Sequence, residues 1–169
     1  MFFNFFELIR IKDWLKNFIL FLPLIFSNNI KNIEKYNELL IAFLIFCLVS
    51  SLIYIINDIK DIDSDKLHPI KRKKKPLASN QFSIFFAKTI SVIFFLIIFI
   101  ILFFNKIYIY HISTYIILNI IYTFFAKKIV FIDLLILSFG YVVRVDMGSI
   151  SIGVQTSTLM ILTIFSLSF

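Results

Sequence analysis

The sequence predicts an all-α protein, a polytopic bundle of transmembrane helices. Of its 169 residues, 60% are hydrophobic, against about 45–50% in an average soluble domain, and 16% are charged. The mean hydropathy of +0.97 indicates the same. Glycine and proline each occur three times, too rarely for a β-sandwich or a disordered chain. Helices are therefore expected, because backbone groups in lipid must be satisfied within their own segment.

The cysteine count and the charge narrow the function classes. Cys47 is the single cysteine and lies in an apolar run, so neither a disulfide framework nor a cysteine metal site can form. The net charge of +7 comes from 17 basic residues that mostly lie between apolar runs. The positive-inside rule explains that pattern without a nucleic acid. We expect membrane lipid as the surroundings and no nucleic acid as a partner, and we leave a homo-oligomer open.

The first elements are a lead-in and a short apolar segment. Residues 1–16 are amphipathic and carry three basic residues and Trp14, which suits the membrane surface. Residues 17–27 are apolar but short and contain Pro23. They form a span only with their polar start included or with packing against neighbouring helices. A signal peptide is not expected, because no small-residue cleavage site follows.

Stronger spans follow along the chain. Residues 39–56 and 82–104 are almost uninterrupted apolar runs, long enough to cross a hydrocarbon core of about 30 Å as helices. Three further apolar stretches with short connectors complete a set of about six spans: residues 107–126, 129–145 and 150–169. Short connectors make consecutive spans antiparallel. The chain from residue 1 to residue 169 is expected to form one transmembrane domain.

The one substantial polar segment is a loop over residues 58–81. It carries seven basic and four acidic residues. The lead-in has three basic residues and the Lys127–Lys128 connector has two, whereas the alternating connectors hold two and one. By the positive-inside rule, the lead-in, the loop and the double-lysine connector lie on the cytoplasmic face of the cell membrane.

Side-chain oxygens gather where the first strong span meets this loop. If the helix continues, Asn57, Asp61 and Asp65 form one polar stripe, because they are spaced by four residues. Asp58 borders the stripe and Asp63 points away from it. Hard oxygen ligands with this layout suit Mg²⁺ that bridges to a diphosphate, and the bases that follow suit phosphate. The alternative is an ordinary charged loop in which the acids balance the lysines.

The acidic stripe stands in a longer series of motifs. Its own motif is Asn57-Asp58-x-x-Asp61-x-x-x-Asp65. The other blocks are Arg10-x-x-x-Trp14-x-Lys16-Asn17, His68-Pro69-x-Lys71-Arg72, Lys75-Pro76-Leu77-Ala78-Ser79, and Tyr122, Lys127, Asp133, Gly140, Arg144 and Gly148. In this order they resemble the UbiA superfamily of intramembrane prenyltransferases, and within it the decaprenyl-phosphate phosphoribosyltransferase branch. The resemblance covers nearly the whole chain.

The resemblance implies a UbiA-like helical fold and a set of site residues. Mg²⁺ would be held by Asn57, Asp61 and Asp65, with Asp58 beside them, so that Asp58, Asp61 and Asp65 are the expected catalytic residues. Substrate and diphosphate would be bound by Lys16, Asn17, Lys71, Arg72, Lys75, Tyr122, Lys127, Lys128, Asp133 and Arg144.

The resemblance also implies a reaction. In the phosphoribosyl branch, phosphoribosyl diphosphate gives its phosphoribose to a polyprenyl phosphate, a step toward cell-envelope glycolipids. Elsewhere in the superfamily, a polyprenyl diphosphate is attached to an aromatic or quinone-type acceptor. Both reactions ionise a carbon–diphosphate bond. A non-catalytic polytopic membrane protein is the alternative from another class.

The chain departs from the superfamily pattern in several respects, one of which is Asp146, where an apolar residue would be expected. Lys75 stands where the branch usually has arginine, so it neutralises a phosphate without a bidentate fork. Tyr122 is followed by Lys127 and Lys128 at a spacing one or two residues longer than usual, which leaves open which lysine faces the site. About six of the superfamily's roughly nine spans are present, without its second polar motif. Since Phe169 ends the chain inside an apolar run, we expect a C-terminal truncation.

Some ionisable residues fall within expected spans. Charge there is costly, so Asp133 and Arg144 are functional candidates by default. Asp133 could hold a lysine or a ribose hydroxyl. A straight helix would put Arg144 about 25 Å from Lys127, so pairing with Asp146 or reaching outward is its alternative. His111 is expected to have no special role.

Overall fold

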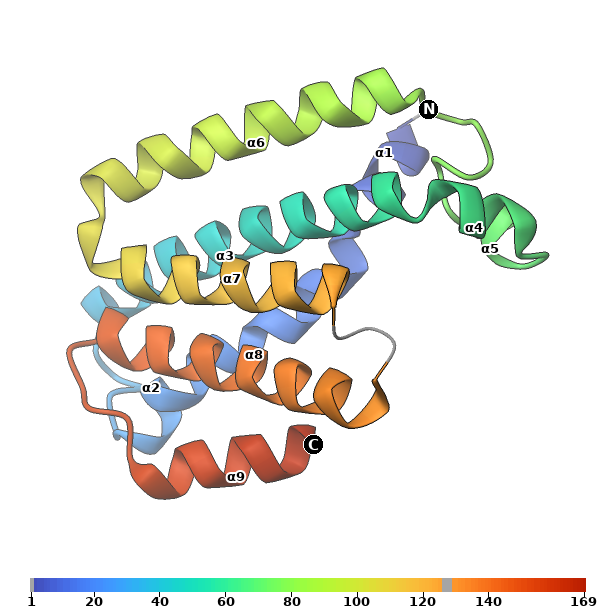
Figure 1. Ribbon diagram of the computed structural model, residues 1–169. Coiled ribbons are helices and arrows are strands. Elements are labelled where there is room, and N and C mark those ends of the chain that lie inside the picture. The colour runs from blue at the N-terminus through green and yellow to red at the C-terminus, as the bar shows by residue number, and fades with distance from the viewer. Residues whose placement is uncertain (1, 126–128) are drawn as a thin grey trace. The chain divides into compact units, whose positions relative to one another are not determined.

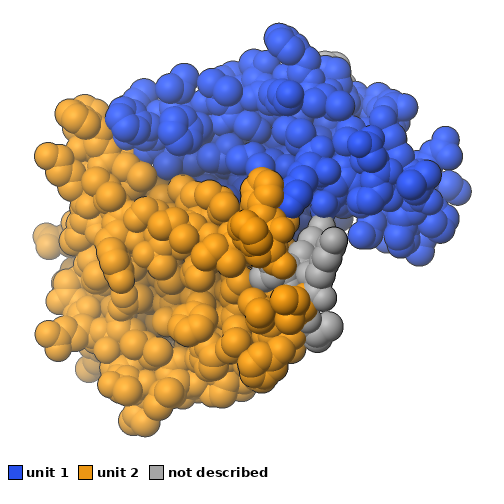
Figure 2. Space-filling view, in the orientation of Figure 1, with its two compact units in different colours: residues 1–15, 47–101 blue, residues 16–46, 102–169 orange. Residues whose placement is uncertain are grey.

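The structure is a computed structural model that describes residues 2–125 and 129–169 (Figure 1). In these ranges all regular structure is helical and no strand occurs. The chain divides into two compact units, which are described separately. Unit 1 contains residues 1–15 and 47–101, and unit 2 contains residues 16–46 and 102–169 (Figure 2). The all-α fold that the composition predicts is confirmed.

Unit 1 contains the first helix, the C-terminal part of the longest helix, and the polar loop. Helices η1, α3 and α6 also contribute residues to unit 2. The elements are α1 (Phe2–Leu8), the start of the 3-10 helix η1 (Ile11–Phe21), α3 (Ile33–Lys60), α4 (Ile62–Leu67), α5 (Lys71–Lys74) and α6 (Ile84–Phe104). The loop over residues 58–81 therefore contains two short helices of its own.

An apolar core joins these elements of unit 1. Its buried members are Leu8, Ile9, Ile55, Ile62, Leu77 and Ala87. Leu8 and Ile9 belong to the segment expected as an amphipathic lead-in, and Leu8 has no exposed surface. Burial of apolar side chains, worth about 1.5–3 kcal/mol each, thus fixes the start of the chain to the core of unit 1.

Helix α8 (Val130–Ser151) is the centre of unit 2. It contacts α2 (Leu22–Phe26), α7 (Ile109–Phe124) and α9 (Thr158–Ser168) (Figure 1). A short 3-10 turn, η2 (Lys106–Tyr108), precedes α7. A second apolar cluster in this unit consists of Leu24, Leu39 and Ile152.

One glycine lets α8 approach the backbone of η1 closely. A Cβ atom built at Gly148 would lie 2.1 Å from the carbonyl oxygen of Leu20. No side chain fits at that distance from a backbone atom. Small residues that let backbones approach are the usual device for packing membrane helices.

Among the described residues, three helical segments are long and apolar enough to cross a membrane: Ile33–Lys60, Ile84–Phe104 and Lys106–Phe124. They correspond to the predicted spans 39–56, 82–104 and 107–126. Few residues of helix α6 are fully buried, so much of its apolar surface is available to lipid. The protein is membrane-integral.

The ends of the expected span set differ from the prediction. Residues 17–27 do not form one helix, because η1 ends at Phe21 and the short α2 starts anew with Pro23 in its first turn, where proline needs no N–H partner. Residues 150–169 are not one helix either. Helix α8 runs on to Ser151, the chain turns at Gly153 with φ of +67°, and α9 begins at Thr158.

Hydroxyl side chains in the apolar helices bond to their own backbone. Thr89 and Ser91 in α6, and Thr163 and Ser168 in α9, each donate to the carbonyl oxygen four residues earlier. Such bonds satisfy a polar group without any contribution from another helix.

Candidate functional site

The acidic stripe lies at the junction of α3 and α4. The N–H of Asp61 donates to the carbonyl oxygen of Asn57, and the N–H of Asp65 donates to that of Asp61, each at 2.9 Å. This four-residue pattern continues across the break between the two helices, so the three residues follow one another along one face, as their spacing predicts. Asp63 is exposed.

Two carboxylates of this segment are buried and share one lysine. The side chains of Asp58 and Asp65 are 4% and 3% exposed. The Nζ atom of Lys75 lies 2.8 Å from Oδ1 of Asp58 and 2.6 Å from Oδ2 of Asp65. Lys71 makes a longer contact, 3.8 Å from its Nζ to Oδ1 of Asp65. Lys75 is therefore the counter-charge that buried carboxylates require.

Arg10 reaches the same cluster from the start of the chain. Its Nη2 donates to Oδ1 of Asp58 at 2.7 Å, and its guanidinium lies 4.8 Å from the ring centroid of Tyr54. The backbone of Arg10 has φ of +53°, which is uncommon for a residue with a side chain. Tertiary contacts hold it there. Arg10 was noted in the sequence only as part of a motif, because no local pattern indicates a contact with a residue 48 positions away.

The electrostatics of the cluster favour a charged lysine. Burial lowers the pKa of Lys75, but hydrogen bonds and Coulomb attraction from Asp58 and Asp65 raise it by more. The pKa of Lys75 therefore lies above its ordinary value of 10.5. Lys75 is fully protonated at neutral pH.

Two hydrogen bonds connect the start of the chain to α3 near this cluster. The indole N–H of Trp14 donates to Oγ of Ser51 at 2.9 Å, and the hydroxyl of Ser51 donates to the carbonyl oxygen of Ile9 at 2.7 Å. Trp14, expected as an interface residue, thus also has a partner inside unit 1. These bonds help position Arg10, which lies between Ile9 and Trp14 in sequence.

The donor set suits a divalent cation by its chemistry. Asn57, Asp61 and Asp65 offer amide and carboxylate oxygens, the ligands that Mg²⁺ prefers. Within residues 2–125 and 129–169, however, no three His, Cys, Asp or Glu side chains form a group that could hold a metal. Asp65 is bound to Lys75 instead. The magnesium site stays a prediction.

The other predicted diphosphate-binding residues of unit 1 lie on α5. Lys71 and Arg72 are both exposed, and Lys71 alone of the two has an ion pair with the stripe among the described residues. His68 accepts from the N–H groups of Ile70 and Lys71 through Nδ1, at 3.2 and 3.4 Å. It therefore holds the turn into α5.

Arg144 and Asn17, both predicted as binding residues, meet inside unit 2. The Nε of Arg144 donates to Oδ1 of Asn17 at 2.8 Å, and its Nη2 donates to the hydroxyl of Tyr115 at 2.7 Å. A third bond, at 2.8 Å, runs from Nη1 to the carbonyl oxygen of Gly140. Arg144 is 5% exposed and Asn17 is fully buried.

Aromatic rings complete the surroundings of this guanidinium. The Cζ of Arg144 lies 5.0, 4.7 and 5.3 Å from the ring centroids of Phe46, Tyr115 and Tyr141. Among the described residues, no carboxylate forms an ion pair with it. Cation–π contacts with the ring faces and hydrogen bonds to neutral oxygens therefore offset the free-energy cost of burying the charge of Arg144. Pairing with Asp146, the alternative considered from the sequence, does not occur.

Asp146 pairs with a histidine instead. Its Oδ2 lies 3.0 Å from Nε2 of His111, and its Oδ1 accepts from the hydroxyl of Thr156 at 2.5 Å. His111, for which no special role was expected, is buried and joins α7 to α8.

The remaining predicted residues are dispersed in unit 2 or lie outside the described residues. Lys16 is exposed, whereas Tyr122 and Asp133 are half-buried. Oδ1 of Asp133 is buried without a hydrogen-bond partner. Lys127 and Lys128 lie outside the described residues.

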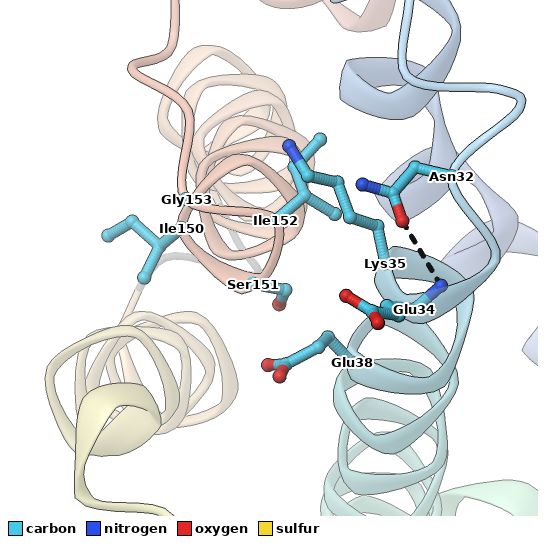
Figure 3. A pocket seen from close by; sticks show the side chains of 8 residues that line it. All are labelled: Asn32, Glu34, Lys35, Glu38, Ile150, Ser151, Ile152 and Gly153. Carbon is cyan, nitrogen blue, oxygen red and sulfur yellow. Dashed lines mark hydrogen bonds between the residues drawn. The ribbon is translucent and has the colours of Figure 1, made fainter.

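A pocket in unit 2 contains none of the predicted site residues. It has a volume of ≈ 340 Å³ and lies between the start of α3 and the end of α8 (Figure 3). Its polar lining comes from Asn32, Glu34, Lys35, Glu38 and Ser151. Oδ1 of Asn32 accepts from the N–H of Glu34 at 3.2 Å and so stabilises the start of α3.

Three apolar helices of spanning length and a polar cluster at the end of one of them define an integral membrane protein of the helical class. Residues 18–169 match the model of the UbiA prenyltransferase family. The chain belongs to this family, which confirms the resemblance seen in its motifs.

Curated relatives carry two kinds of name. The chain is 30% identical over 162 residues to a decaprenyl-phosphate phosphoribosyltransferase of Corynebacterium glutamicum, covering 88% of this chain and 46% of the relative. It is 32% identical over 89 residues to one of Mycobacterium tuberculosis, covering 50% and 29%. It is also 39% identical over 77 residues to nodulation protein NoeC of Azorhizobium caulinodans, covering 46% and 24%. The chain spans less than half the length of these relatives.

Proposed function

We propose that the protein is an intramembrane transferase that moves phosphoribose from phosphoribosyl diphosphate to a polyprenyl phosphate, at the cytoplasmic face of the cell membrane. The observation that carries the proposal is the buried cluster in which Lys75 contacts Asp58 and Asp65 at the end of the apolar helix α3. The names of the relatives in Corynebacterium and Mycobacterium support the transfer of a phosphoribosyl group to a polyprenyl phosphate.

The residues of unit 1 have distinct roles in this proposal. Asn57, Asp61 and Asp65 would hold Mg²⁺, which stabilises negative charge on the departing diphosphate. Lys75 offers positive charge to the phosphate oxygens, and exposed Arg72 offers a bidentate fork. No protein nucleophile is required, because the electrons of the breaking carbon–oxygen bond leave with the diphosphate.

A second candidate is prenyl transfer to an aromatic or quinone-type acceptor, and the family's own name favours prenyl transfer. It uses the same cluster, because a carbon–diphosphate bond ionises in both reactions. The third candidate is a non-catalytic membrane protein in which the acids fix the basic loop. The contacts of Lys75 with Asp58 and Asp65 are also what that alternative expects.

Labelled substrates separate the three candidates. Membranes that contain the protein are given labelled phosphoribosyl diphosphate with polyprenyl phosphate, or labelled polyprenyl diphosphate with an aromatic acceptor. A labelled phosphoribosyl lipid supports the first candidate, and a labelled prenylated ring supports the second. Failure of both, with the protein present and folded, leaves the third.

A pair of matched substitutions tests the stripe itself. Asp61→Asn is expected to lower the rate at least about 100-fold, because it removes a charged ligand of the Mg²⁺ that would stabilise the negative charge on the departing diphosphate. Asp63→Asn is the same replacement at an exposed position outside the stripe. The rate of this variant should stay within about twofold of the wild-type rate. Initial rates of product formation at saturating substrate measure both. Equal losses in the two variants would contradict the roles assigned to the stripe.

A further inference from the structure

Most basic side chains of the loop over residues 58–81 are exposed, whereas two of its four acidic side chains are buried. Asp58 and Asp65 are buried against cations, and of the four acidic residues Asp63 is the exposed one. The residues Lys71–Lys74 are all exposed, as is Lys66. The outer surface of the loop is therefore strongly basic, although the loop as a whole contains four carboxylates.

Two large aliphatic side chains lie among these exposed cations. Leu67 is 87% exposed and Ile70 is 59% exposed. The hydrogen bonds of His68 to the backbone of Ile70 and Lys71 fix the turn that presents them. Aliphatic side chains beside lysine and arginine are typical of segments that bind at a membrane interface. We call residues 66–74 the basic tip.

The position of the basic tip in the chain favours lipid as its partner. It follows α3 and precedes α6, both of spanning length, so it lies near the water–lipid boundary. The four cations of α5 occupy one helical turn and are distributed around its circumference, so they cannot all face one pocket. A plane of anionic headgroups attracts such a cluster without fixed geometry.

We infer that the basic tip docks on anionic lipid headgroups, with Leu67 and Ile70 entering the interface. Each cation near an anionic surface favours the docked position by roughly fivefold, and salt weakens the attraction. This inference does not require the proposed transferase activity. Lys71 and Arg72 are shared with that proposal, but the tip's other cations, Lys66, Lys73 and Lys74, have no role in the reaction.

A polarity-sensitive dye at the tip tests the inference. The full chain with Cys47→Ala and Leu67→Cys carries the dye and is placed in nanodiscs of phosphatidylcholine alone or with phosphatidylglycerol. Leu67 is exposed, so its replacement leaves the core intact. We expect emission to shift to the blue, and quenching by a bilayer-embedded nitroxide to increase severalfold, only with phosphatidylglycerol. Added salt should reverse both.

Two matched variants complete the experiment. The same dye at Ser64→Cys, exposed on α4 outside the tip, should not respond to lipid charge. The second variant carries Lys73→Gln and Lys74→Gln together with the dye at Leu67→Cys. The factor by which phosphatidylglycerol favours the docked position should fall about 25-fold in this variant, the product of two fivefold effects.

Several outcomes would overturn the inference. Blue-shifted emission in detergent or in phosphatidylcholine alone would mean that the tip packs against protein. An equal response to inorganic pyrophosphate in both lipids, without a response to lipid charge, would mean a soluble phosphate ligand. Unchanged lipid dependence after Lys73→Gln with Lys74→Gln would remove the charge argument.

Discussion

Lys75 contacts both buried carboxylates of the acidic segment through a single nitrogen atom, at 2.8 and 2.6 Å. A lysine is well suited to this task, because its three N–H donors can turn toward two acceptors that lie on different sides. Arg10 shares Asp58 with it. At the residue scale, the site therefore has matched charges before any substrate arrives.

Lys75→Gln should lower the free energy of unfolding by about 2 kcal/mol at neutral pH, because two buried carboxylates lose a counter-charge. In the wild-type protein, folding raises the pKa of Lys75. The stabilising contribution of its charge is therefore complete below the unfolded pKa of 10.5, and it declines as the pH rises through the higher pKa of the folded state. The difference between wild type and variant should therefore be constant from neutral pH to pH 10.5 and shrink above it. Thermal unfolding in metal-free detergent solution measures it.

Lys73→Gln is the control for this pH series, since Lys73 is exposed and bears the same charge. It should be within about 0.5 kcal/mol of wild type at every pH. A constant difference for Lys75→Gln across the alkaline range would contradict the assignment of the stabilisation to its charged form.

At the element scale, the close contact between α8 and η1 depends on the absence of a side chain at Gly148. Gly148→Ala should destabilise unit 2 by about 1–3 kcal/mol, because the new methyl group would meet a backbone oxygen that cannot turn aside. Gly140→Ala in the same helix is the matched control. Its Cβ would lie 3.5 Å from its nearest neighbours, an ordinary contact. If the two variants unfold at the same temperature, the close approach of α8 to Leu20 is wrong.

The hydroxyl of Tyr115 links α7 to α8 through Arg144. Tyr115→Phe keeps the ring against the guanidinium and removes only the acceptor. The expected loss is about 1–2 kcal/mol, the range for a hydrogen bond to a charged group in a membrane helix bundle. A double-mutant cycle with Asn17→Leu should show coupling through Arg144, and strict additivity would argue against a shared network.

Sequence patterns predict the local part of this structure and miss the long-range part. The apolar runs give α3, α6 and α7 because the hydrophobic signal is contained in each segment. The length of α8 was missed, because Asp146 and Gly148 look like a helix end, although Asp146 has a partner in His111 and Gly148 packs closely against Leu20.

The same division applies to the candidate site. The four-residue spacing of Asn57, Asp61 and Asp65 predicts their common face, which the backbone hydrogen bonds bear out. The contact of Arg144 with Asn17 joins residues 127 positions apart, and a single sequence contains no signal for such a pair. Their role in substrate binding stays a prediction.

At the scale of the whole molecule, alternation of basic connectors predicts which loops share a side of the membrane. A cysteine at Ser64, in the loop after α3, should react with a membrane-impermeant reagent only from the cytoplasmic side. A cysteine at Lys106, between α6 and α7, should react only from the other side. Labelling of intact cells and of inverted vesicles, in a Cys47→Ala background, distinguishes the two. Labelling of both positions from one side would contradict the orientation.

The hydroxyl groups that bond within α6 have a consequence for assembly. The hydroxyls of Thr89 and Ser91 need no hydrogen-bond partner from a neighbouring helix. Lys88 lies one turn from the start of α6, so its side chain can reach the headgroups. Such a rod can enter the bilayer alone and rotate about its long axis there without leaving a polar group unsatisfied. The rotation of α6 about its axis is then determined by the packing of apolar side chains such as Phe86 and Phe94 against the core of unit 1.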